Sequence, residues 1–137
     1  MGPKSDVITY LSEARRAYES AVLLFESGDL RSAANRAYYA SFYAVTAILL
    51  THYVTVSKHS ALVSMFRDMV KKGLIQPQDT ARDLSKKFTK AYELREVSDY
   101  KLATKVTKKQ VEECIKGAKE IIEFADRYCN ERLPKLI

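Results

Sequence analysis

The sequence predicts an all-α protein folded as an up-down bundle of four to five helices. Its 137 residues contain only 4 Gly and 3 Pro, so they offer few of the residues that favour turns between short strands. Apolar residues recur at alternating steps of four and three along most of the chain, which is the spacing of one helix face. With 47% hydrophobic and 29% charged residues, the chain is typical of one globular domain.

The first helix is expected over residues 5–26. Its apolar stripe is formed by Val7, Leu11, Ala14, Tyr18, Ala21 and Phe25. Ser27 and Gly28 end this helix, and the side chain of Asp29 can cap the next one. The second helix, residues 30–53, is apolar almost all round, so it should be the central and most buried element.

The third and fourth helices are expected over residues 60–72 and 77–98, with a proline at the first position of the fourth. The fifth helix is expected over residues 107–132. Thr107 and Gln110 have the spacing of a reciprocal capping box at its start. Short connections between helices of this length favour an up-down bundle.

Charge and hydropathy limit the possible partners. The net charge is +6 and the isoelectric point is near 9.3, which favours a polyanionic partner without specifying one. Lysines gather around the fourth helix and the loop after it, at Lys86, Lys87, Lys90, Lys101, Lys105, Lys108 and Lys109. The longest apolar run, residues 37–50, is too short to span a bilayer. Because residues 1–10 also lack a signal-peptide pattern, we expect a cytoplasmic protein without a membrane partner.

Two cysteines and two histidines give no metal-ligand spacing. Cys114 and Cys129 lie on one expected helix, where fifteen residues at about 1.5 Å each place them roughly 22 Å apart. They are too distant to form a disulfide with each other. We therefore expect two reduced thiols and neither a metal nor a cofactor.

The most informative stretch is Arg95-Glu-Val-Ser-Asp99-Tyr100, because charged residues occupy positions that should be apolar. The stripe upstream is formed by Leu84, Phe88 and Ala91. Further steps of four residues reach Arg95 and then Asp99. Because a buried charge is costly unless it is paired, the pattern predicts either a structural ion pair between these two residues or part of a functional site.

The second and third helices carry further candidate residues. In Asn35-Arg36-Ala37-Tyr38-Tyr39-Ala40, the tyrosines are either bundle interior, with their hydroxyls bonded at its rim, or part of a site with Arg36. His59 begins the third helix, and it is either a capping or loop residue or a group that binds phosphate or transfers protons. His52 gives less indication of a role.

Together these segments resemble the small prokaryotic members of the HEPN family. The resemblance is carried by residues 35–40, by Lys58-His59, by Leu94-Arg95-x-x-x-Asp99-Tyr100, and by residues 118–125 of the last helix. Because it covers nearly the whole chain, residues 1–137 are expected to form a single HEPN-like domain. The resemblance implies a homodimer in which two copies form one composite cleft. It also implies a possible nucleotidyltransferase partner in a toxin–antitoxin pair.

Many HEPN proteins are metal-independent ribonucleases whose signature is an arginine followed, after four to six residues, by a histidine. Arg95 matches this arginine, but Tyr100 stands at the histidine position, and no histidine follows His59. An ordinary tyrosine, with a pKa near 10, is a poor base at neutral pH. Asp99 is expected to pair with Arg95 and hold it. His59 can replace the missing base only if the third helix presents it beside Arg95.

Three hypotheses follow. In the first, the protein is a dimeric binding module with a groove that receives a nucleotide, an RNA phosphate or a partner nucleotidyltransferase. The groove would be lined by Arg95, Asp99, Tyr100, Arg36 and Tyr39. In the second, it is a metal-independent endoribonuclease that uses Arg95 with Tyr100 or His59. In the third, the pair of charges only fixes helix register, and the protein acts as a structural assembly partner.

Overall fold

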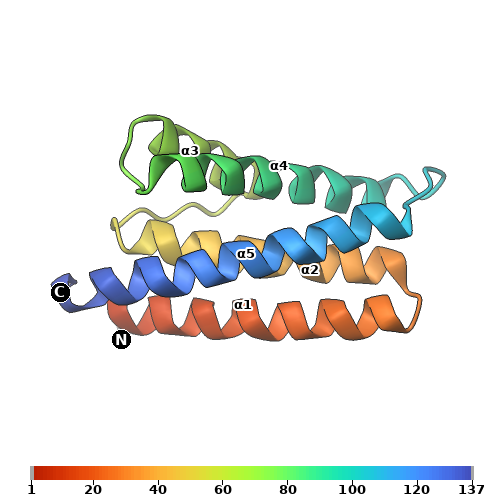
Figure 1. The fold of residues 1–137 in the computed structure, drawn as a ribbon, viewed down its shortest axis with the longest axis horizontal. Coiled ribbons are helices and arrows are strands. Elements are labelled where there is room, and N and C mark those ends of the chain that lie inside the picture. Colours follow the sequence, from red (N-terminus) through yellow and green to blue (C-terminus); the bar gives the residue numbers. More distant parts are fainter. Residues whose placement is uncertain (1, 137) are drawn as a thin grey trace.

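The computed structural model describes residues 2–136 as five long helices followed by a short 3-10 turn (Figure 1). The elements are α1 (Pro3–Glu26), α2 (Leu30–Leu50), α3 (His59–Lys71), α4 (Gln78–Tyr100), α5 (Lys108–Arg132) and η1 (Leu133–Lys135). No strand occurs within residues 2–136. The all-α helical bundle expected from the sequence is therefore confirmed.

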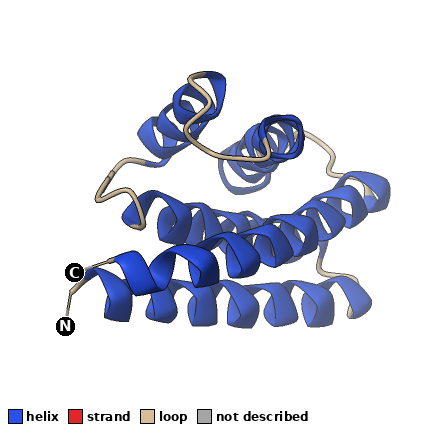
Figure 2. Cartoon of the chain, turned by 60° about the vertical axis from the view of Figure 1, so that its left-hand side comes forward, coloured by secondary structure: helices blue, strands red, loops and turns tan. Residues whose placement is uncertain are grey.

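Helix α2 is the central element of the bundle, because it contacts each of the other four helices. Helices α1, α2 and α5 run side by side, and α3 and α4 pack over the side of α2 that faces away from α1 (Figures 1 and 2). Twelve of the 21 residues of α2 are buried. The prediction that the second helix is the most enclosed part of the fold is thus confirmed.

Large side chains from four helices fill the core around Tyr38, which is fully buried. Phe88 of α4 stacks on the Tyr38 ring, with 6.0 Å between centroids and 8° between planes. Phe66 of α3 meets Phe88 edge to face at 6.3 Å. Ile48 of α2 and Ile121 of α5 belong to the same core cluster. The tyrosine ring therefore belongs to the hydrophobic core, while its hydroxyl extends to the edge of that core.

The expected capping residues act as predicted. The Asp29 carboxylate accepts a hydrogen bond from the backbone N–H of Ser32 at 3.2 Å, at the start of α2. At the start of α5, Thr107 Oγ1 accepts from the Gln110 N–H at 3.2 Å, and the Gln110 side chain accepts from the Thr107 N–H at 2.9 Å. This reciprocal pair satisfies two backbone donors that a helix start otherwise leaves unpaired.

The end of α2 and the start of α4 differ from the expected boundaries. Helix α2 ends at Leu50, three residues early, because Tyr53 adopts a left-handed conformation (φ 59°) that cannot continue the helix. Pro77 does not occupy the first helical position of α4. Its backbone is extended (ψ 134°), so it precedes the helix, which begins at Gln78.

Cys129 is buried and Cys114 is half-buried, and neither forms a disulfide. Burial raises the pKa of Cys114 to about 11 and that of Cys129 to about 12, so both are protonated thiols at neutral pH. No helix within residues 2–136 combines the length and the apolar character needed to cross a bilayer.

His52 joins the end of α2 to the end of α5. Arg132 Nη2 lies 3.4 Å from His52 Nδ1 and can only donate, so Nδ1 must accept and the ring proton belongs on Nε2. Nε2 then donates to the Tyr128 hydroxyl at 2.6 Å, and that hydroxyl donates to the backbone carbonyl of Leu74 at 3.4 Å. Arg132 also donates from Nε to Thr51 Oγ1 at 3.1 Å. The neutral imidazole therefore fits this chain of donors, whereas a protonated ring would direct a second N–H at a cation.

We expect the melting temperature to fall as the pH is lowered from 7.5 to 5.5. Burial and the charge of Arg132 lower the pKa of His52, so the unfolded chain binds a proton more readily than the folded one. Stability is then fully present above the unfolded value, near 6.5, and is lost as the pH falls toward the folded value. In His52→Gln, which cannot titrate, this decrease should be smaller in scanning calorimetry. Equal decreases in the two proteins would show that His52 does not couple folding to protons.

Candidate functional site

Arg95 is the only charged residue that is buried within residues 2–136, with 9% of its surface exposed. It continues the buried stripe of α4 formed by Leu84, Phe88 and Ala91. Burial on its own would lower the pKa of Arg95, but Tyr39, Tyr100, Asp99 and Glu96 outweigh that effect and raise it. The guanidinium is therefore a permanent positive charge at the end of a buried apolar stripe.

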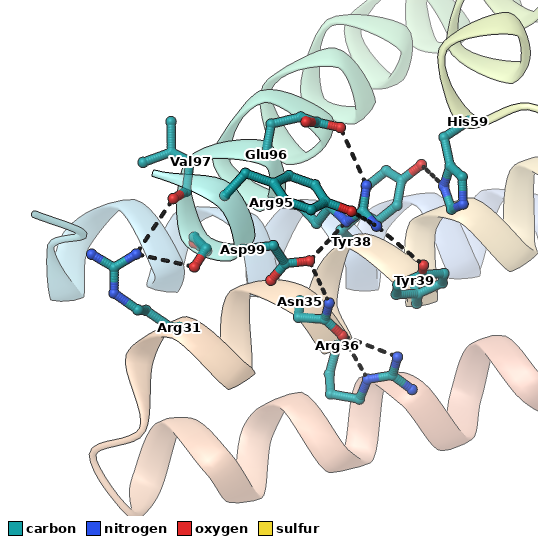
Figure 3. A network of polar contacts seen from close by, with 12 residues as sticks. Arg31, Asn35, Arg36, Tyr38, Tyr39, His59, Arg95, Glu96, Val97 and Asp99 are labelled. Atoms are coloured by element: carbon teal, nitrogen blue, oxygen red, sulfur yellow. Dashed lines mark hydrogen bonds and ion pairs between the residues drawn. The ribbon is translucent and has the colours of Figure 1, made fainter. Parts of the chain in front are cut away.

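Two carboxylates of α4 balance this charge (Figure 3). Asp99 Oδ2 lies 3.0 Å from Arg95 Nε, and Glu96 Oε1 lies 3.2 Å from Arg95 Nη1. The Asp99 oxygen stands off the line of the Nε–H bond, so this contact is an ion pair without a hydrogen bond. The predicted pairing of Asp99 with Arg95 is confirmed.

Asn35 of α2 connects this ion pair to a second arginine. Its Nδ2 donates to Asp99 Oδ2 at 3.0 Å, and its Oδ1 accepts from Arg36 Nε at 3.1 Å and Arg36 Nη2 at 3.0 Å (Figure 3). The Arg36 guanidinium also lies over the Tyr39 ring, 4.9 Å from its centroid. A continuous polar chain thus runs from Arg36 through Asn35 and Asp99 to Arg95.

Three tyrosine rings surround the Arg95 guanidinium. Its Cζ lies 5.5 Å from the centroid of Tyr38, 5.7 Å from that of Tyr39 and 5.4 Å from that of Tyr100, all within the range of cation–π attraction. Nη2 also donates to the hydroxyls of Tyr39 at 3.4 Å and Tyr100 at 3.5 Å. Those hydrogen bonds are long and therefore weak, so Nη2 is the least firmly held part of the guanidinium.

His59 is the first residue of α3, and it lies at the same cluster. Its Nδ1 is 2.7 Å from the Tyr38 hydroxyl, and its ring is 4.7 Å from the ring of Phe42 and 5.6 Å from that of Tyr39. Burial and the charge of Arg95 lower the pKa of His59, so the imidazole is neutral at neutral pH. Tyr38 therefore contacts both residues: its hydroxyl hydrogen-bonds to His59, and the Arg95 guanidinium lies over the face of its ring.

Arg31 of α2 holds the last turn of α4 in place. Its Nη1 donates to the carbonyls of Val97 and Ser98 at 3.4 and 3.0 Å, and its Nη2 donates to the carbonyl of Leu102 at 3.2 Å and also to that of Thr104. The final carbonyls of a helix have no partner within the helix. This extra support accompanies a helix that continues to Tyr100, two residues beyond the expected end at residue 98.

The structure brings together every residue that the sequence indicated: Arg95, Asp99, Tyr100, Arg36, Tyr39 and His59. We call these six, together with Asn35, Tyr38 and Glu96, the Arg95 site. Asn35 and Glu96 were not among the expected site residues, and the sequence left open whether Tyr38 belongs to the core or to a site. Each of the three stands next to an expected residue or a helical turn away from one. No group of three or more His, Cys, Asp or Glu side chains suited to a metal ion occurs among the described residues.

A model of the HEPN domain matches residues 8–128 of the chain. The matched span contains every residue of the Arg95 site. The chain belongs to the HEPN family. Its HEPN fold is thus established by the sequence match as well as by the helical bundle.

Named relatives of this HEPN protein occur in bacteria and archaea. A "UPF0332 protein" of Thermotoga maritima is 32% identical over 129 residues, which cover 93% of this chain and 94% of the relative. Two proteins of Methanocaldococcus jannaschii are named "Putative toxin MJ0605" and "Putative toxin MJ0142". MJ0605 is 30% identical over 95% of this chain and 93% of its own length. MJ0142 is 28% identical over 80% of this chain and 71% of its own length.

Proposed function

We propose that this HEPN protein is the toxin-type member of a toxin–antitoxin system and that its Arg95 site binds a phosphate group of RNA or a nucleotide. The observation that carries the proposal is the Arg95 guanidinium, in a residue only 9% exposed, whose Nη2 forms no hydrogen bond within residues 2–136 except two long ones to tyrosine hydroxyls. Two relatives that are named "Putative toxin", and that align with this chain over most of their own lengths, support the assignment to a toxin–antitoxin system.

The charges of the site favour phosphate at Nη2. Asp99 and Glu96 are arranged on Nε and Nη1, so they hold the guanidinium without occupying Nη2. A phosphate oxygen carries a negative charge, so it attracts the guanidinium more strongly than a neutral tyrosine hydroxyl does and can displace the two tyrosines. Arg36 supplies a second positive charge, because no carboxylate within residues 2–136 lies at ion-pairing distance from it.

A second copy of the chain is the proposed neighbour of this site, and a nucleotidyltransferase is the proposed antitoxin. Next to the site, Tyr100 is 66% exposed and Leu102 is 73% exposed, so a second chain that covered both would bury apolar surface directly beside Arg95. A dimer whose contact surface lies away from both Arg95 and Tyr100 would contradict this arrangement.

Replacing Arg95 by alanine should weaken the binding of a labelled trinucleotide RNA at least about tenfold, because one charge-assisted hydrogen bond contributes roughly 1.5–3 kcal/mol. Fluorescence anisotropy in the presence of a chelator measures this change. Arg16→Ala is the matched control, since Arg16 is a largely exposed arginine of α1 and its loss should leave binding nearly unchanged. If both variants bind as the wild type does, Arg95 does not bind phosphate.

Ribonuclease activity is a second candidate function, favoured by the position of His59. In metal-independent cleavage, the RNA 2′-oxygen attacks the phosphorus and the bond from phosphorus to the 5′-oxygen breaks. This leaves a 2′,3′-cyclic phosphate and a 5′-hydroxyl. The neutral His59 imidazole would accept the proton of the 2′-hydroxyl, Tyr100 or water would supply one to the leaving oxygen, and Arg95 would offset the charge on the phosphate.

The same labelled RNA, incubated in chelator and analysed for cyclic phosphate ends, tests this second function. Cleavage should be lost in Arg95→Ala and reduced about 10²-fold or more in His59→Ala, the usual contribution of a proton-transfer group. Tyr100→Phe separates the two candidate groups, because it removes the phenol and leaves His59 in place. Absence of cleavage by the wild type would leave phosphate binding as the function of the site.

A further inference from the structure

A groove lined mainly by basic residues lies on the opposite side of α4 from Arg95. A hollow of about 550 Å³ opens between α3 and α4, the pair of helices at the top of Figure 1. We call it the α3–α4 groove. It is lined by six basic residues, Arg67, Lys71, Arg82, Lys86, Lys87 and Lys90, and by two acidic ones, Asp83 and Glu93. The groove therefore carries a net charge of +4 (six minus two).

Most of this charge is not neutralised within the protein. Lys87 pairs with Asp83 at 2.9 Å and with Glu120 at 2.7 Å, and Arg82 pairs with Asp79 at 3.4 Å. The four other basic residues have no carboxylate at ion-pairing distance within residues 2–136: Arg67, Lys71, Lys86 and Lys90. All four are exposed, so their charges are available to a ligand.

The basic residues form two rows with the hollow between them. Arg67 and Lys71 are one turn apart on α3, and Arg82, Lys86 and Lys90 follow one another by single turns on α4. Residues four apart on a helix repeat about every 6 Å along one face. Regular positive charges on both sides of an open channel suit a flexible chain that carries a negative charge on each repeating unit.

The lining favours recognition of a backbone over recognition of bases or of a protein. It contains no aromatic residue on which a base could stack, and Val70 is its only large apolar side chain. Stable protein interfaces have apolar and aromatic centres, which this groove lacks. We propose that the α3–α4 groove binds the phosphodiester backbone of a single-stranded nucleic acid without regard to its sequence.

This surface is separate from the Arg95 site. Lys86 and Arg95 are nine residues apart on α4, which places their side chains about 180° apart around the helix axis. Arg95 faces α2, where it contacts Tyr38 and Tyr39, whereas Lys86 faces the hollow beside α3. The proposal does not depend on the proposed function of Arg95.

The test is fluorescence anisotropy of labelled 20-nucleotide RNA and DNA strands of one sequence, in chelator, from 50 to 300 mM salt. The wild-type chain is compared with the groove variant, which combines Arg67→Gln, Lys71→Gln and Lys86→Gln. The control is Lys4→Gln/Arg16→Gln/Lys135→Gln, which removes three exposed cations outside the groove, at the chain ends and on α1. Melting curves establish that both triple variants fold.

We expect the wild type to bind RNA and DNA with similar affinity. The groove variant should bind both at least about tenfold more weakly at 50 mM salt. The slope of log affinity against log salt should also decrease in magnitude by about 2, since each phosphate contact contributes about 0.7. The control should keep both values. Equal losses in the two triple variants would assign binding to net charge alone and overturn the proposal.

Discussion

Replacing Phe88 by alanine is expected to lower the free energy of unfolding by about 3–5 kcal/mol, the usual cost of truncating a fully buried phenylalanine. Phe88 has no exposed surface and lies between Tyr38 and Phe66. No backbone movement can close the space left between three packed helices without opening another contact. At roughly 3–4 °C for each kcal/mol in a domain of this size, the melting temperature should fall by about 10–20 °C.

Leu23→Ala is the matched control for Phe88→Ala. Leu23 is also a large apolar residue on a helix, but it is 68% exposed, so its truncation should change stability by less than about 0.5 kcal/mol. Denaturant unfolding followed by circular dichroism measures both. If the two substitutions cost the same, Phe88 is not part of the core described above. Phe88→Ala should also weaken binding of the trinucleotide RNA, because the Tyr38 ring of the Arg95 site loses the ring that stacks on it.

The second large effect on stability is expected from breaking the ion pair between Arg95 and Asp99. Asp99→Leu should destabilise the fold by about 2 kcal/mol, because it removes one of two counter-charges from a guanidinium that has only 11% of its side chain exposed. The cost stays below the roughly 3–5 kcal/mol of a fully orphaned buried charge, since Glu96 remains. The double variant Arg95→Leu/Asp99→Leu extends the apolar stripe of Phe88 and Ala91, and it should recover most or all of that loss.

The control for the ion pair lies on the same helix. Asp83 and Lys87 have the same spacing of four residues, but the Asp83 side chain is 59% exposed, so Asp83→Leu should cost less than about 0.5 kcal/mol. Ligand binding then separates the hypotheses. A stable double variant that still binds the trinucleotide RNA would show that Arg95 and Asp99 serve only to fix the packing of α4. A stable double variant that no longer binds it would support a phosphate site.

Much of the fold could be read from the sequence because the helices obey local rules. The stripes of α1, α4 and α5 and the caps at Asp29 and Thr107 depend on residues close together in the chain. The errors occurred at ends that depend on contacts or on backbone geometry. Nothing near Tyr53 signals its left-handed conformation. Helix α4 continues two residues beyond its expected end, where Arg31, 66 or more residues earlier in the chain, binds the carbonyls of Val97 and Ser98.

The candidate site was only partly predictable. Arg95 could be predicted as a site residue because a charge on an apolar stripe is rare. The spacing of four residues indicated Asp99 as its partner. Asn35 gave no such signal, because an asparagine on a helix has many ordinary uses. For Tyr38, the sequence alone did not decide between the core and the site. The position of His59 depends on how α3 folds back over α2 after the turn at residues 51–58, and sequence spacing does not determine that path.

Arg31 has a consequence for how the site can change during evolution. It lies four residues before Asn35 and within eight of Tyr38 and Tyr39, so one helix carries the anchor for the end of α4 together with much of the Arg95 site. A shift of α2 along its axis would carry the last turn of α4 with it and preserve the distances between them. Arg31 also binds the carbonyls of Leu102 and Thr104, so an insertion or deletion between α4 and Thr104 would remove part of this anchor.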